Sequence, residues 1–84
     1  MLISRKSDLI CREVDGKLVG LDLRSSRYFS LNPTGTRLWR LLESGADSDA
    51  LVDALVESHQ IDREVAATDV AQFIDSLRAQ ELLE

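Results

Sequence analysis

Hydrophobic and polar positions alternate along the first third of the chain, and they follow a helical spacing after that. The alternation predicts three strands, at about residues 9–14, 17–23 and 27–31. Between the first two lies Asp15-Gly16, a strong two-residue hairpin signal, because both positions of that turn require a positive φ. Three consecutive antiparallel strands form a meander whose first and third strands are its edges.

The alternation also assigns side chains to faces of this sheet. In the second strand, three apolar residues share one face: Val19, Leu21 and Leu23. In the third strand, the odd-numbered residues lie on one face and the even-numbered residues, Tyr28 and Ser30, on the other.

From Pro33 onward, the apolar spacing of about 3.6 predicts three helices, at about residues 33–43, 48–58 and 62–79. Asn32 is a favoured N-cap, and Pro33 suits the first helical position, where a missing N–H costs nothing. Capping residues also precede the other two helices: Asp47 or Ser48 for the second and Asp62 for the third. The fold class is therefore α+β, and 84 residues suit one domain spanning 1–84.

The junction between the third strand and the first helix is the most informative segment. Residues 27–35 run from a strand into a helix start with no loop between them. This junction holds a free sheet edge rigidly against the helices, and such an edge can receive a peptide as one more strand.

The third helix carries an unusually wide apolar arc. Its six apolar residues spread over about 180° of the circumference, whereas packing needs about 100°. They are Val65, Ala66, Val70, Phe73, Ile74 and Leu77. Asp69 lies inside this arc, between Val65 and Phe73. Either the whole arc packs inward with Asp69 at its rim, or part of it forms a groove with the third strand.

Charge is distributed unevenly along the chain, whose net charge is −5. Residues 1–40 carry eight basic and four acidic side chains, and residues 41–84 carry two basic and eleven acidic ones. An acidic helical half argues against nucleic acid, whose phosphates require Lys and Arg. It is either a solvated surface or a docking face for a basic partner.

Other motifs narrow the function further. No apolar run approaches the roughly 20 residues of a membrane span, and no secretory signal is present, which predicts a cytoplasmic protein. The single cysteine, Cys11, is expected to be a buried small hydrophobe. One Cys and one His, His59, do not supply a metal site, and His59 is expected to be exposed or capping. Without a nucleophile or phosphate loop, we expect neither an enzyme nor a bound cofactor or metal.

The segments 27–36, 61–64 and 69–77, in this order of elements, resemble the PqqD family over about residues 8–83. These proteins are precursor-peptide recognition elements of ribosomally made, post-translationally modified peptides. The resemblance implies a winged helix-turn-helix-like fold and a non-catalytic chaperone, which binds a precursor's leader segment and presents it to a modifying enzyme. The leader would lie as an extra strand beside the third strand, against the third helix. The leader-binding residues implied are Arg27, Tyr28, Phe29, Ser30, Leu31, Ala66, Asp69, Val70, Phe73 and Leu77.

Within the family, Asn32-Pro33-Thr34-Gly35 and the stand-alone length are more similar to lasso-peptide leader-binding proteins. That similarity implies a cysteine-protease-like leader peptidase or other modifying enzyme as partner. The acidic helical half and the lack of a long apolar run predict no contact with nucleic acid or membrane. The chain departs from the family at residues 80–82, where many relatives have a glycine before the terminal apolar pair. The alternatives are a pyrroloquinoline-quinone pathway peptide chaperone, a winged-helix DNA-binding regulator and a plain protein–protein adaptor.

Overall fold

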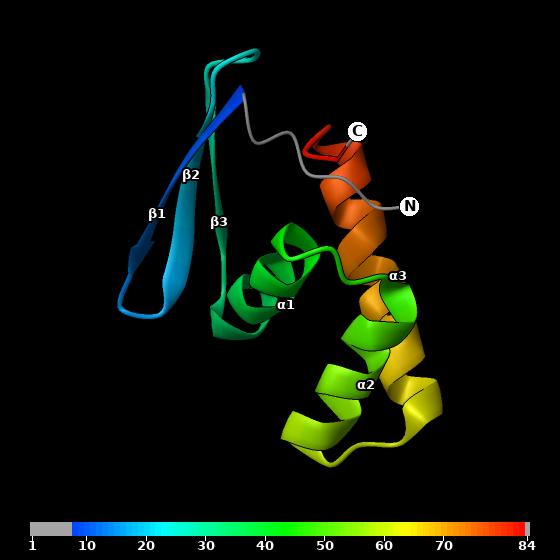
Figure 1. Cartoon of the computed structure of the whole chain (residues 1–84). Helices are drawn as coiled ribbons and strands as arrows, with labels where there is room; N and C mark the ends of the chain where they lie inside the picture. The colour runs from blue at the N-terminus through cyan, green and yellow to red at the C-terminus, as the bar shows by residue number, and fades with distance from the viewer. Residues whose placement is uncertain (1–7, 84) are drawn as a thin grey trace.

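The computed structural model describes residues 8–83 and contains six elements (Figure 1). They are β1 (Leu9–Val14), β2 (Lys17–Asp22), β3 (Arg27–Leu31), α1 (Pro33–Glu43), α2 (Ser48–His59) and α3 (Arg63–Ala79). This order confirms the predicted α+β fold of three antiparallel strands followed by three helices. The differences are single residues at the ends of β2 and α2 and at the start of α3, where Asp62 is the N-cap.

The sheet has the order β1-β2-β3, and both pairs are antiparallel. The predicted hairpin turn is confirmed, since Asp15 and Gly16 have φ values of 53° and 79°. The register aligns Cys11, Gly20 and Phe29 across the three strands, and Ile10, Leu21 and Tyr28 in the adjacent row. Because side chains alternate along a strand, these two rows point to opposite faces of the sheet.

All three helices lie on one side of the sheet, which we call the inner face (Figure 1). The Phe29 ring on this face lies against Gly20, where an added Cβ would overlap ring atoms Cζ, Cε1 and Cε2. Phe29 also packs on Trp39 of α1, with ring centroids 6.1 Å apart and ring planes inclined by 52°. The lack of a side chain at Gly20 therefore leaves room for the Phe29 ring between the sheet and α1.

The hydrophobic core joins the inner face to all three helices. Its buried members are Leu9, Leu18, Phe29, Leu38, Trp39, Leu42, Leu51, Val52, Leu55, Ala66, Val70, Ile74, Leu77 and Leu82. Helix α1 packs against β2 and β3, while α2 packs against both α1 and α3. The opposite, outer face of the sheet contributes no buried residue to this cluster.

The outer face carries the apolar residues that the alternation assigned to one side of the second strand. Val19 and Leu23 are exposed on it, and Leu21 is partly buried. The inward side of β2 instead carries Leu18 and Gly20. The alternation correctly grouped these residues, but the larger apolar set is the one that faces away from the helices.

The expectation that Cys11 is buried is wrong, because its side chain is exposed. Cys11 lies opposite Gly20 and so points to the inner face, but β1 is the sheet edge beyond most of the helical cover. Partial burial and the nearby Glu43 carboxylate raise the pKa of the thiol, and Arg40 opposes this shift. The thiol therefore stays protonated at neutral pH.

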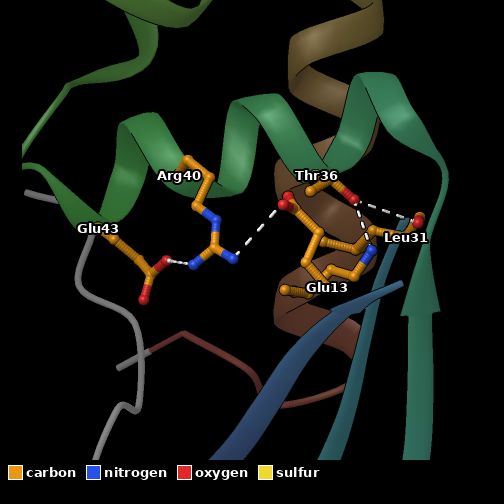
Figure 2. A network of polar contacts seen from close by, with 6 residues as sticks. Glu13, Leu31, Thr36, Arg40 and Glu43 are labelled. Atoms are coloured by element: carbon orange, nitrogen blue, oxygen red, sulfur yellow. Dashed lines mark hydrogen bonds and ion pairs between the residues drawn. The ribbon is translucent and has the colours of Figure 1, made fainter. Parts of the chain in front are cut away.

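Side-chain hydrogen bonds fix the junction between β3 and α1 (Figure 2). The Asn32 side chain caps α1 by accepting from the Gly35 N–H at 2.7 Å, as predicted. The buried Thr36 hydroxyl accepts from the Leu18 N–H at 2.8 Å and donates to the Leu31 carbonyl at 3.3 Å. One side chain of α1 thus joins the start of β2 to the end of β3.

The other helix ends are formed in different ways. Asp47 caps α2 by accepting from the Ala50 N–H at 2.9 Å, whereas Asp62 occupies the N-cap of α3 without a side-chain hydrogen bond. After α3, Glu81 has a φ of 58°, and the following Leu82 N–H donates to the Leu77 carbonyl at 2.9 Å. This left-handed position falls within residues 80–82, where the resemblance led us to expect a glycine.

Candidate functional site

One edge of the third strand pairs with no other strand of residues 8–83. Within residues 8–83, β2 is the only strand that pairs with β3. Strand edges present a row of N–H and C=O groups to which another extended chain can bond. The edge is held in place by Thr36 and Asn32 at its C-terminal end.

Two surface hollows lie near this edge, one at each end of β3. Residues of α3 line both hollows, and the segment after α3 also lines the first. The first, the Tyr28 hollow, has a volume of about 560 Å³ and lies at the start of β3. Its lining includes Arg27, Tyr28, Phe29, Ala79, Gln80 and Leu82. The second, the Phe73 hollow, has a volume of about 420 Å³ and lies just beyond the end of β3. Its lining includes Gly35, Leu38, His59, Val65, Asp69 and Phe73.

The wide apolar arc of α3 divides into two sides. Residues four apart lie above one another on a helix, so Val65, Asp69 and Phe73 form one side, and all three line the Phe73 hollow. The other side, which contains Ala66, Val70, Ile74 and Leu77, is buried in the core. Part of the arc therefore packs inward and part lines an open hollow.

Asp69 brings an uncommitted negative charge to the Phe73 hollow. Its side chain is exposed, and it has no hydrogen bond or ion pair within residues 8–83. The surrounding wall is mostly apolar, with Leu38, Val65 and Phe73 among its members. The hollow can therefore hold an apolar side chain and offer a carboxylate acceptor to a nearby donor.

The structure brings half of the ten predicted site residues to these hollows. Arg27, Tyr28 and Phe29 line the Tyr28 hollow, and Asp69 and Phe73 line the Phe73 hollow. The other five line neither. Ser30 and Leu31 lie on the strand between the hollows, Ala66 and Leu77 are fully buried, and Val70 lines a separate hollow between α2 and α3.

Of the residues that line the Phe73 hollow, the predicted site contains only Asp69 and Phe73, and two of those it lacks, Val65 and His59, are instructive. Val65 is 50% exposed there, and its four-residue spacing from Asp69 was a usable signal. His59 ends α2 with its Nε2 3.4 Å from the Thr34 hydroxyl and its Nδ1 2.8 Å from the Ser58 hydroxyl. Its place depends on the end of α2 meeting the start of α1, which no local pattern encodes.

Gly35 lines the Phe73 hollow beside the Phe73 ring. A Cβ at this position would lie 3.4 Å from Phe73 Cε1 and 3.2 Å from the capping oxygen of Asn32. A side chain here would contact the Phe73 ring and press on the Asn32 cap, so the strand–helix junction and the wall of the hollow meet at Gly35.

Other kinds of functional site find little support in residues 8–83. Within residues 8–83, no group of three or more His, Cys, Asp or Glu is placed to hold a metal ion. No described helix is long and apolar enough to cross a membrane. On α3, the Arg63 guanidinium donates to Asp53 at 2.6 Å, and this hydrogen bond raises the pKa of Arg63. Since Glu64, Asp69 and Asp75 lie on the same helix, α3 does not offer the cationic face that DNA requires.

These features define a small α+β domain of winged helix-turn-helix type whose third strand has an open edge flanked by hollows on α3. The chain belongs to the PqqD family, since the family model described as "Coenzyme PQQ synthesis protein D (PqqD)" matches residues 17–83. The resemblance stated from the sequence is therefore confirmed.

Two solved structures share nearly the whole fold. "TbiB1 in Complex with the TbiA(beta) Leader Peptide" is 34% identical, with a TM-score of 0.90 over 100% of this chain and 95% of that one. "Lasso peptide synthetase B1 complexed with the leader peptide" is 24% identical, with a TM-score of 0.89 over 99% and 96% of the two chains, and supports the fold alone. No curated protein sequence matches this chain.

Proposed function

We propose that this protein binds the leader segment of a ribosomally made precursor peptide as a fourth strand beside β3, with leader side chains seated in the two hollows. The protein is a non-catalytic carrier that acts in the cytoplasm and presents the leader to a modifying enzyme. In a lasso-peptide pathway, that enzyme is a cysteine-protease-like leader peptidase.

The observation that carries this proposal is the unpaired edge of β3 between two hollows lined with α3 residues. An added strand needs free main-chain groups for pairing and pockets for alternate side chains. β3 offers such an edge, with one hollow at its start and the other just beyond its end. The 34% identical relative, whose structure contains a leader peptide, supports the same role and favours it over a pyrroloquinoline-quinone pathway.

The two kinds of contact have different tasks. Each main-chain hydrogen bond along β3 contributes about 0.5–1.5 kcal/mol net, and these bonds set the register of the leader. Each apolar side chain that a hollow buries contributes about 1.5–3 kcal/mol. Ordering and capturing a flexible peptide costs about 4–15 kcal/mol, so the side chains in the hollows decide the affinity.

Substitutions on α3 test the proposal by fluorescence anisotropy, with a labelled leader peptide from the precursor encoded beside the gene. Phe73→Asp and Val65→Asp each place a carboxylate in the apolar wall of the Phe73 hollow. Each is expected to weaken leader binding by at least about tenfold, which corresponds to the loss of one buried apolar anchor. Val65 is half exposed and lies in the first turn of α3, where an aspartate is favourable, so this variant keeps its fold.

Gln72→Asp is the matched control. Gln72 is exposed on α3 next to Phe73 but lines neither hollow, so the same added charge is expected to leave leader affinity unchanged. Circular dichroism checks that each variant is folded. Wild-type affinity in folded Val65→Asp and Phe73→Asp would contradict the assignment of the groove.

A further inference from the structure

The outer face of the sheet is apolar and uncovered. Within residues 8–83, six large hydrophobic side chains are exposed, and five of them lie on this face. The five are Ile10, Val14, Val19, Leu23 and Tyr28, with exposures from 39% to 78%. Leu23 follows β2 directly, and its N–H continues the ladder by donating to the Asp8 carbonyl at 2.9 Å. An exposed apolar surface of this kind marks an interaction site.

These side chains form a continuous surface. Ile10, Leu21 and Tyr28 are direct neighbours across β1, β2 and β3, and Val19 lies in the next outward row. Neighbouring strands are about 4.8 Å apart, so the side chains within such a row touch. The row crosses the whole sheet and ends at Tyr28, the most exposed of these residues at 78%.

The charged side chains that the strands direct to this surface are both positive. Arg12 and Lys17 alternate outward with Ile10 and Val19, whereas the acidic strand residues, Glu13 and Asp22, point to the inner face. The strands thus give the outer face two basic side chains and no acidic one, with Asp15 in the adjoining turn, in a chain of net charge −5. A partner with carboxylates around an apolar patch complements it, and a second copy would bring the same positive face against it.

The outer face is also continuous with the proposed leader site. Tyr28 lies on β3, and a leader paired with the free edge of β3 would direct alternate side chains onto this same face. A protein seated there contacts the carrier sheet and the leader together.

We propose that the outer face, centred on Ile10, Leu21 and Tyr28, is the docking surface for the leader peptidase that receives the leader. The peptidase would present an apolar patch rimmed with Asp and Glu. This inference rests on the proposed function for the identity of the partner, while the surface itself shares only Tyr28 with the lining of the two hollows.

The test measures two affinities for each variant by biolayer interferometry: one for the purified cysteine-protease-like leader peptidase encoded beside the precursor gene, and one for the leader peptide. Ile10→Glu places a carboxylate on the outer face at a 59% exposed position of β1, the strand farthest from the leader edge. It is expected to weaken peptidase binding by at least about tenfold and to change leader affinity by less than about twofold. Arg12→Glu, which reverses a rim charge, is expected to lower peptidase affinity and its salt dependence.

Val65→Asp is the reciprocal variant, expected to lose leader affinity and keep peptidase affinity. Unchanged peptidase binding by folded Ile10→Glu would overturn the docking surface. A wild-type dimer in sedimentation velocity that Ile10→Glu converts to monomer would also overturn it, in favour of a second copy. If the wild type binds no leader but binds the peptidase through Ile10, the proposed function fails and the docking surface is supported.

Discussion

The two sides of α3 both carry apolar residues, but their surroundings differ. Ala66, Val70 and Leu77 are buried against the body of the protein, whereas Val65 and Phe73 line an open hollow beside Asp69. The fold buries the apolar residues of the first side, whereas it leaves those of the second side partly exposed to solvent. The difference between the two sides is apolar surface that the chain's own packing leaves uncovered, and the proposed function makes this surface the binding surface.

The sheet repeats this contrast. Its inner face buries Leu18 and Phe29 under the helices, and its outer face leaves Ile10 and Tyr28 in solvent. In both elements the covered side accounts for stability, and the open side is available to partners. Substitutions on the two sides should therefore separate stability from binding.

The largest expected effect is on the core side of α3. Leu77 is fully buried, and Leu77→Ala is expected to lower the free energy of unfolding by about 2–5 kcal/mol, because it removes buried methyl groups and leaves a cavity. The matched change on the open side, Val65→Ala, should cost no more than about 0.5 kcal/mol. Urea unfolding followed by circular dichroism measures both. Equal losses for the two variants would remove the distinction between the sides.

A smaller effect is expected from the charge in the hollow. Asp69→Asn removes the carboxylate from the Phe73 hollow and should weaken leader binding by about fivefold, roughly 1 kcal/mol, with a reduced dependence on salt. Asp75→Asn is the control, because Asp75 lies on the side of α3 that lines the hollow with α2. Anisotropy titrations at low and high salt measure the effect, and identical losses in the two variants would contradict a local role for Asp69.

The smallest effect concerns the end of α3. Glu81 has a left-handed backbone, which costs a residue with a side chain about 1–2 kcal/mol of stability. A glycine avoids this cost, but its more flexible unfolded chain lowers the free energy of unfolding by about 0.5–1 kcal/mol. Glu81→Gly is therefore expected to raise the free energy of unfolding by at most about 0.5 kcal/mol, since it also removes the interaction that the Glu81 side chain makes. Gln80→Gly, at a φ of −88°, should lower it instead. Thermal unfolding distinguishes them, and stabilisation by both would show that backbone strain is not the cause.

Much of this fold follows from local signals. Asp15-Gly16 supplies positive φ in the hairpin, Asn32 caps α1, and Gly45, with a φ of 99°, ends it. Each depends on the conformational preference of one or two residues, so neighbouring sequence is sufficient to predict it. The junction between β3 and α1 was predictable for the same reason.

The features that were not predictable depend on tertiary cover. Cys11 points to the inner face like Phe29, yet it is exposed because it lies at the sheet edge. The alternation in β2 does not say which face the helices cover. Likewise, the side of α3 that faces the hollow and the presence of His59 there depend on how α1, α2 and α3 pack together.

Amide hydrogen exchange with and without the leader peptide tests the central claim most directly. Residues 27–31 form one edge of the sheet and residues 9–14 form the other, so β1 serves as an internal control for β3. The account predicts that the leader slows exchange in β3 and leaves β1 unchanged. Slowed exchange in β1 alone, or no change in β3 at saturating leader, would contradict it.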